Sequence, residues 1–257
     1  SLDSLPRLFV SQLLYGSPAI QPIPDVDRTD FLLMIGANPL VSGGSIMTAP
    51  GMGRRLRDLQ ARGGRLWVVD PRRTETAALA DEHLAVVPGT DALLLAALVT
   101  TIFEEGLATP GPARVGLDGL ERVRTALAPF TAEQVADAVG LPADTLRDLA
   151  RRFAAAPTAA AYGRMGVSTV DFGALCAWLI DLLNIATGNL DEPGGAVFAK
   201  APVDLVGLTG LLDTAPLLGE VEALGRTLPV VNGELPVALL PEALESGRVR
   251  ALVVVVG

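Results

Sequence analysis

The chain has a single cysteine, Cys176, and a single histidine, His83, among its 257 residues. With one of each, this chain alone cannot build a disulfide framework, a thiolate zinc site or a cysteine-ligated iron–sulfur cluster. A Ser-His-Asp arrangement would have to use His83, which lies in a strand-like segment with no nucleophile elbow beside it. Cys176 lies on the apolar face of a predicted helix, which indicates a buried thiol rather than a reactive one.

Basic charge and long hydrophobic runs are also scarce. The net charge is −9 and Lys200 is the only lysine, so the chain lacks the massed cations that neutralise nucleic-acid phosphates. The longest apolar runs, residues 93–103 and 174–186, are too short or too interrupted to cross a bilayer. Because half of the residues are hydrophobic and 19% are charged, we expect a globular protein with neither a nucleic-acid partner nor a membrane span.

Strands alternate with helices over the first 195 residues. Buried strands are predicted at 31–35, 66–69, 84–87 and 158–162, with helices between and after them. This alternation predicts an α/β fold with a mostly parallel, open sheet covered by helices on both faces. A dense turn cluster ends near residue 195 and predicts a boundary there, so that residues 1–195 form one α/β domain. Residues 196–257 are predicted to hold a loop-rich segment and the truncated start of a second, related α/β domain, whose strand at 252–256 repeats the pattern of 31–36.

Polar residues and glycines follow each of the four predicted strands. The carboxyl ends of parallel strands meet at one edge of a sheet, where α/β folds bind nucleotides. Glycine lets a backbone approach a ligand closely, aspartate accepts hydrogen bonds from ribose, and arginine suits a diphosphate. The candidate site residues, in chain order, are Gly36, Asn38, Pro39, Asp70, Arg72, Gly89, Thr90, Asp91, Gly163, Arg164, Gly166 and Ser168.

Each motif also has a structural explanation of its own. Asn38-Pro39 fits an ordinary Asx-Pro turn, and Asp70 and Asp91 can each cap a helix. No Gly-x-Gly-x-x-Gly follows the first strand, so the standard NAD fingerprint is missing. One ligand crevice explains all four strand ends together, and we therefore prefer the nucleotide interpretation.

Five motifs resemble, in order, the DMSO reductase family of molybdopterin oxidoreductases, which includes formate dehydrogenases and nitrate reductases. They are GANP at 36–39, VVDPRRTETAALADEH at 68–83, PGTDALLLAAL at 88–98, GRMGVST at 163–169 and NIATGNLDEPGGAVF at 184–198. That family holds molybdenum, or sometimes tungsten, through two molybdopterin guanine dinucleotides, one in each of two related α/β domains. The resemblance implies that residues 1–195 bind one dinucleotide, for redox chemistry on a small substrate such as formate or an oxyanion.

The resemblance also implies a role for each matching position. Gly36, Asn38 and Pro39 match the first nucleotide-binding turn, and Asp70 and Arg72 match the ribose and guanine contacts. Gly89, Thr90 and Asp91 match the guanine-recognising turn. The segment near the pterin and its phosphates is matched by Gly163, Arg164, Gly166 and Ser168.

The chain departs from the family in what it does not contain. The family's iron–sulfur cysteines and metal ligand come before the first turn, and a C-terminal β-barrel completes both sites, so no residue here is assigned as catalytic or as a metal ligand. We expect a piece of a larger protein, inactive alone, whose partners are the parent's iron–sulfur domain, second dinucleotide domain and β-barrel, together with electron-transfer subunits. We expect a cytoplasmic location, with export by a twin-arginine leader as the alternative.

Three other interpretations stay open. A molybdenum-free electron-transfer subunit of the same fold, similar to the large iron–sulfur subunit of respiratory complex I, would not need the guanine contacts of Asp70, Arg72 and Asp91. An NAD or thiamine-diphosphate domain is disfavoured by the missing glycine fingerprint. A plain interaction module would not explain polar residues at every strand end.

Overall fold

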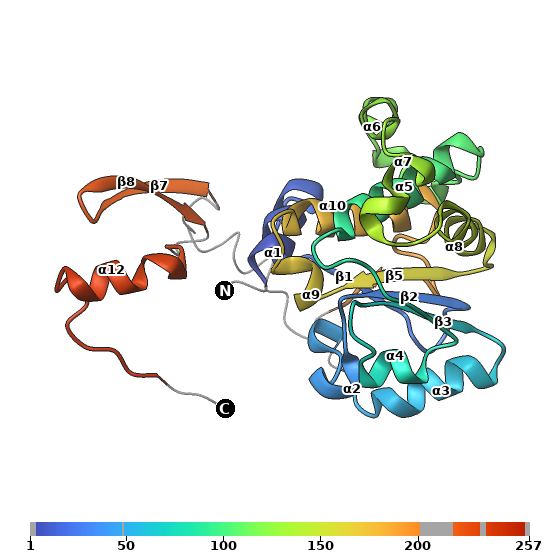
Figure 1. Ribbon diagram of the computed structural model, residues 1–257, viewed down its shortest axis with the longest axis horizontal. Coiled ribbons are helices and arrows are strands. Elements are labelled where there is room, and N and C mark those ends of the chain that lie inside the picture. Colours follow the sequence, from blue (N-terminus) through green and yellow to red (C-terminus); the bar gives the residue numbers. More distant parts are fainter. Residues whose placement is uncertain (1–3, 48, 201–217, 232–234, 255–257) are drawn as a thin grey trace. The chain divides into compact units, whose positions relative to one another are not determined.

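The computed structural model describes residues 4–47, 49–200, 218–231 and 235–254 (Figure 1). The chain divides into two compact units, one of residues 3–200 and one made mainly of residues 201–257. The larger unit contains all of the predicted site residues. The domain boundary predicted at residue 195 lies close to this division, but its assignment as the junction of two cofactor domains stays a prediction.

A four-stranded parallel sheet forms the centre of the larger unit, with the strand order β4-β3-β2-β5. All five residues of β2 are buried, as a central parallel strand covered on both faces requires. The third strand was predicted at 84–87 but runs from Glu82 to Leu84. It ends earlier than predicted because Val87 leaves the sheet and donates its N–H to the Val139 carbonyl at 3.0 Å. The strands are β2 (Phe31–Ile35), β3 (Arg65–Val69), β4 (Glu82–Leu84) and β5 (Ala159–Gly163).

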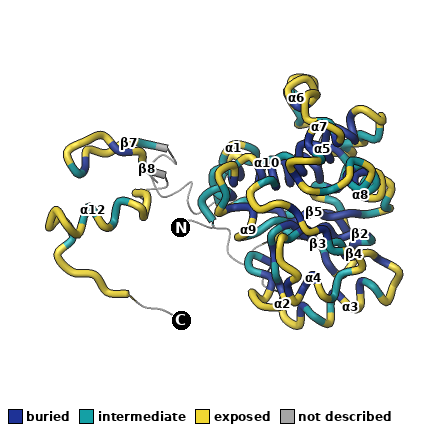
Figure 2. Tube along the Cα trace, viewed as in Figure 1, coloured by how far each residue is buried: buried dark blue, intermediate teal, exposed yellow. Residues whose placement is uncertain are grey.

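Helices cover both faces of this sheet, which confirms the predicted architecture (Figure 1). One face packs Phe31, Leu33 and Ile35 against α5 (Asp91–Glu104), α6 (Leu120–Leu127), α7 (Ala132–Val139), α8 (Ala143–Ala155) and α10 (Gly173–Ala186). The other face packs Leu32 and Met34 against η1 (Ser45–Met47), α3 (Met52–Ala61) and α4 (Glu75–Leu79). Helix α5 is buried on nearly all sides (Figure 2), because it contacts α7, α8 and α10. Short turns of helix complete the unit at α2 (Pro39–Ser42), η2 (Gly111–Gly116) and α9 (Met165–Ser168).

A buried ion pair fixes the amino-terminal helix to the sheet layer. Helix α1 (Leu5–Tyr15) packs against α10, where Arg7 donates to both carboxylate oxygens of Asp181 at 2.7 and 2.6 Å. The Tyr15 hydroxyl donates to the same carboxylate at 2.8 Å, and Asp181 is only 1% exposed. Beside this pair, β1 (Pro22–Pro24) and β6 (Ala196–Phe198) form a small antiparallel sheet.

The sequence Ser168-x-x-Asp171 predicts that Ser168 caps the helix that follows. In the structure Ser168 ends α9, and α10 begins at Gly173 with Phe172 at the N-cap. The chain turns tightly there because Gly173 has no side chain; a Cβ would lie 2.4 Å from the Ser168 carbonyl oxygen. The apolar spacing of this helix also predicts Phe172 and Leu175 on its buried face. They are instead 60% and 42% exposed, whereas Cys176, Leu179, Leu182 and Leu183 form the buried face.

The smaller unit contains a β-hairpin where loops were predicted. β7 (Leu218–Ala223) and β8 (Arg226–Val231) pair as antiparallel strands. They are joined by Leu224 and Gly225, whose φ angles of 55° and 74° are typical of a two-residue primed turn. The prediction of a loop-rich segment over 196–240 is therefore wrong for 218–231.

The prediction of a carboxyl-terminal strand at 252–256 is also wrong for residues 252–254, which the structure describes. Leu252, Val253 and Val254 are exposed and have no strand partner, and a strand without a partner has no ladder of hydrogen bonds to stabilise it. The last residues of that prediction, 255–257, lie outside the described residues. Before it come η3 (Val237–Leu239) and α12 (Leu240–Glu245), whose Glu242 pairs with Arg226 at 2.6 Å.

Candidate functional site

The order of the strands reverses between β2 and β5. From β2 the chain moves outward through β3 to β4, whereas β5 lies on the opposite side of β2. In an open parallel sheet, this switch in direction leaves a crevice outside the carboxyl ends of the two central strands. Ile35 and Gly163 are register partners at that edge, so the loops that follow them flank the crevice.

These two loops touch each other through glycine backbone. Gly166 donates its N–H to the Gly36 carbonyl at 2.9 Å. A Cβ on Gly166 would lie 2.6 Å from the Gly36 Cα, and a Cβ on Gly36 would lie 2.8 Å from the Gly166 Cα. Gly36 also has a φ of 56°, so both positions require glycine.

Asn38 ties the loop after β2 to the loop after β3. Its Oδ1 accepts from the Thr76 hydroxyl at 2.8 Å and from the Thr76 N–H at 3.3 Å, and its Nδ2 donates to Glu75 at 2.7 Å. Three of the four hydrogen-bonding positions of the amide are thereby used inside the protein. Asn38 therefore holds the turn that Pro39 follows, and it keeps one N–H for a ligand.

Asp70 follows β3 and forms an Asx turn. Its Oδ1 accepts from the Arg72 N–H at 2.9 Å, and the His83 Nε2 lies 2.8 Å from its carbonyl oxygen. The exposed Arg72 guanidinium lies 3.8 Å from Glu75. A pair this exposed contributes little to stability, so Arg72 can turn toward a phosphate at small cost.

Asp91 is a buried carboxylate at the start of α5. It is 6% exposed, and burial raises the pKa of its carboxyl; its own backbone N–H opposes that shift and the negative charge of Asp70 adds to it. Burial, with a smaller effect of Asp91, also raises the pKa of the Cys176 thiol to about 12. In the loop before this helix, Gly89 has a φ of 84° and the Thr90 hydroxyl donates to the Val87 carbonyl at 2.7 Å.

The segment after β5 wraps over the end of β2. Arg164 donates its N–H to the Ile35 carbonyl at 3.4 Å, and its own carbonyl accepts from the Ser168 N–H at 3.1 Å. Arg164 and the buried Ser168 line a closed cavity of about 20 Å³ together with Arg7 and Asp181, which is room for about one water molecule. The structure thus places Arg164 and Ser168 at the β5 end of the crevice edge, and Asp70 and Asp91 at the β3 and β4 end.

Two contacts at this edge were not predicted. Glu75 and Thr76 form hydrogen bonds with the Asn38 side chain. The residue that could have indicated an ordered loop here is Thr74, a typical N-cap, which caps α4 by accepting from the Ala77 N–H at 3.1 Å. The partners of Asp181 were also missed, although a lone acid in an apolar helix indicates a buried charge that needs a cation.

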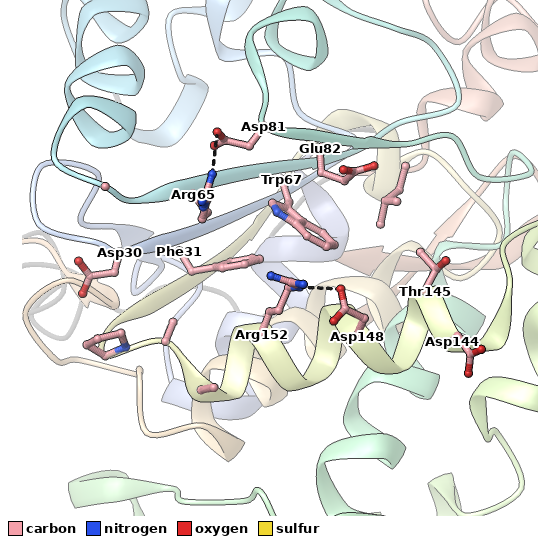
Figure 3. A pocket seen from close by; sticks show the side chains of 15 residues that line it. Asp30, Phe31, Arg65, Trp67, Asp81, Glu82, Asp144, Thr145, Asp148 and Arg152 are labelled. Carbon is pink, nitrogen blue, oxygen red and sulfur yellow. Dashed lines mark hydrogen bonds and ion pairs between the residues drawn. The ribbon is translucent and has the colours of Figure 1, made fainter.

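A large open groove lies at the opposite, amino edge of the sheet, away from the predicted site (Figure 3). It occupies about 960 Å³ between α8 and the first residues of β2, β3 and β4, and no predicted site residue lines it. The candidate site is therefore defined by the convergence of loops at the carboxyl edge, where carboxylates, guanidinium groups and bare glycine backbone form a set of contacts suited to a nucleotide.

Within the described ranges, no three or more His, Cys, Asp or Glu side chains are grouped to hold a metal ion. No helix in the same ranges has the length and apolarity to cross a membrane.

An open parallel sheet with glycine-bearing, polar loops at its carboxyl edge defines the class of α/β domains that bind nucleotides at a switch point. A family model described as molybdopterin oxidoreductase matches residues 5–232. The chain belongs to the molybdopterin oxidoreductase family, as its motifs predicted.

Relatives of this chain include formate dehydrogenases and nitrate reductases. It is 32% identical over 175 residues to formate dehydrogenase H of Escherichia coli, covering 68% of this chain and 24% of that protein. It is 35% identical over 186 residues to the assimilatory nitrate reductase of Haloferax mediterranei, covering 72% and 25%. Acetylene hydratase from Pelobacter acetylenicus shares the fold, with a TM-score of 0.62 and 23% identity over 72% of this chain and 24% of that one. The chain thus spans about a quarter of the length of these relatives.

Proposed function

We propose that this chain is the cofactor-binding portion of a molybdopterin oxidoreductase. In this proposal, it holds one guanine dinucleotide of a bis-molybdopterin cofactor that carries molybdenum or tungsten. Family membership and similarity to formate dehydrogenases and nitrate reductases support it. The cofactor, when bound, supplies the redox chemistry on a small substrate such as formate or an oxyanion, and this chain's residues bind and orient it.

The observation that carries the proposal is the contact between Gly36 and Gly166 at the switch point. Because neither residue has a side chain, the backbones of the two loops meet at the carboxyl edge of the sheet, and a diphosphate would bind beside this crossing. Gly166 is exposed, and its loop is held in place by its hydrogen bond to Gly36. In other dinucleotide folds, a glycine in the turn after a strand likewise lets the backbone approach a pyrophosphate.

The charged residues of the edge suit the two ends of a guanosine diphosphate group. Asp91 offers acceptor oxygens for the guanine N1–H and amino group, a pair of donors that adenine lacks. Arg72 offers a guanidinium fork for phosphate, while Asp70 accepts from ribose hydroxyls. By the family resemblance, Arg164 and Ser168 serve the pterin end and its phosphates.

The partners and location that we propose follow from the family resemblance and the short coverage of its relatives. The partners are an iron–sulfur domain, a second dinucleotide domain, a β-barrel domain and electron-transfer subunits. Only a quarter of the relatives' length is matched, so these parts lie outside the aligned region. We place the protein in the cytoplasm, with export through a twin-arginine leader as the alternative.

A second candidate function is a molybdenum-free electron-transfer subunit of the same fold. The internal hydrogen bonds of Asn38 and the burial of Asp91 favour it, because both residues are already engaged in the protein. Such a subunit would bind no guanine nucleotide, which separates it from the leading proposal.

Isothermal titration calorimetry of the chain with GDP, ADP and NAD tests the proposal. We expect weak binding of GDP, about tenfold tighter than ADP, a difference of about 1.4 kcal/mol. Asp91→Asn is expected to remove most of this preference, since one acceptor oxygen becomes a donor. The control Asp137→Asn, on the exposed face of α7, is expected to leave it unchanged. Tighter binding of ADP or NAD would overturn the guanine assignment, and no binding of any nucleotide would favour the second candidate.

A further inference from the structure

The groove at the amino edge of the sheet is separate from the cofactor site. Its floor is Trp67 of β3, which is half-buried and packs against Phe31 with ring centroids 5.6 Å apart. The guanidinium carbon of Arg152 lies 5.8 Å from the centroid of the Trp67 ring. Figure 3 shows this arginine extending from α8 toward the ring, so the aromatic floor already accepts a cation from the helix side.

The lining of the groove has an excess of negative charge. Arg65 pairs with Asp81 at 3.6 Å, and Arg152 pairs with Asp148 at 2.6 Å. Three further carboxylates line the groove, so five acids face two arginines and the lining has a net charge of −3. The three are Asp30, whose carboxylate accepts from the Thr158 hydroxyl, and the exposed Glu82 and Asp144.

The groove is open along the edge of the sheet. Among the described strands, β4 pairs with β3 alone, so its outer edge has no neighbouring strand. Glu82 is on that edge strand, and Asp144 lies across the groove at the start of α8 (Figure 3). Proteins cover or charge such edges to control what pairs with them, and here the charge is of one sign.

We propose that this groove is a docking surface for an arginine- or lysine-bearing segment of a partner protein. A cationic side chain that enters the groove meets the carboxylates of Glu82 and Asp144, which attract a guanidinium or ammonium group, and competes with Arg152 for the face of Trp67. The net charge of −9 on the whole chain adds long-range attraction for a basic partner. A second copy of this chain, equally acidic, is a poorer match.

Trp67 fluorescence tests this docking surface directly. The probe is the peptide Ac-GRGRGRG-NH2, titrated into the chain at low ionic strength, with Ac-GEGEGEG-NH2 as the acidic counterpart. We expect a saturable change with the basic peptide only, lost in Trp67→Phe, and weakened by high salt. Glu82→Gln with Asp144→Asn is expected to weaken binding about fivefold, whereas Glu121→Gln with Asp137→Asn, exposed acids outside the groove, leaves it unchanged.

Several results would overturn the docking proposal. One is an equal fluorescence response to the acidic peptide, and another is unchanged binding of the basic peptide in Glu82→Gln with Asp144→Asn. A third is equal weakening in that variant and in Glu121→Gln with Asp137→Asn, which would indicate attraction by net charge alone. A response to Mg²⁺ alone that matches the peptide response would assign the groove to a divalent cation instead. Because all four substituted acids are exposed, misfolding does not complicate the comparison. The experiment is independent of nucleotide binding, so its failure and that of the proposed function are distinguishable.

Discussion

At the scale of single residues, two buried carboxylates show how the surroundings decide what a charge does. Asp181 is held by Arg7 and Tyr15, so its charge is compensated. Asp91 has no such cation in the described contacts, and burial raises the pKa of its carboxyl. A buried carboxylate with a raised pKa at the carboxyl edge of a parallel sheet is typical of a functional position.

Replacing Asp181 tests the first of these environments. Asp181→Ala leaves the Arg7 guanidinium buried without its partner, and we expect the free energy of unfolding to fall by about 3–5 kcal/mol. Urea denaturation followed by circular dichroism measures the change. Asp137→Ala, at an exposed position, should stay within about 0.5 kcal/mol of the parent; a similarly small loss for Asp181→Ala would show that the ion pair does not hold α1 in place.

The pH dependence of stability tests the environment of Asp91. A raised pKa in the folded state means that protonated Asp91 stabilises the fold at low pH, and that this stabilisation is lost as the pH rises through the raised pKa. Asp91→Asn removes the ionisation, so we expect a higher melting temperature than the parent at pH 7 and a smaller gain near pH 3. If the gain in melting temperature of Asp91→Asn over the parent were smaller at pH 7 than near pH 3, the assigned environment of Asp91 would be contradicted.

Residue patterns predicted the burial of Cys176 but not the hydrogen bonds of Asn38. Apolar periodicity reports which face of a helix is buried, and Cys176 lies on that face. The partners of Asn38 come from a loop 37 and 38 positions away, and sequence spacing does not encode which loops meet.

At the scale of elements, the crossing of the β2 and β5 loops sets the geometry of the candidate site. Strands β2 and β3 were predictable because continuous runs such as Phe31–Ile35 are typical of strands buried on both faces. The hairpin at 218–231 was missed because Gly219 and Pro229 look like loop residues, although each is tolerated in a two-stranded hairpin with free edges. Helix α9 was missed because four residues give no periodicity to read.

Gly166→Ala tests whether the loop crossing matters. The new Cβ would lie 2.6 Å from the Gly36 Cα, so the loops must separate, and we expect a loss of about 1–3 kcal/mol in the free energy of unfolding together with loss of GDP binding. Gly116→Ala is the matched control, since a Cβ there meets nothing within 4 Å. Equal behaviour of the two variants would mean that the close approach has no role.

At the scale of the whole molecule, family membership was predictable because five short motifs recur in order, each at a strand end or turn. What the motifs do not fix is the metal ligand, since the chain spans about a quarter of its relatives. The arrangement of the second predicted α/β domain is likewise not encoded in residues 196–257, where local patterns gave a strand that the described residues do not form.

The family resemblance predicts that this chain alone does not bind molybdenum. In that family the metal ligand precedes the first nucleotide-binding turn and a β-barrel completes the site, and no residue of this chain is matched to either. We expect metal analysis of the purified chain to find far less than one molybdenum or tungsten per chain, and dye-linked assays with formate or nitrate to show no turnover. Stoichiometric metal, or activity with either substrate, would contradict this expectation.

Mapping a guanine nucleotide onto the chain by NMR tests the central claim most directly. Amide chemical shifts are followed as GDP is added to labelled protein. We expect the largest changes to fall together in the four loops that contain Gly36, Asp70, Asp91 and Gly166. Changes confined to the groove around Trp67 or to the hairpin at 218–231 would contradict it.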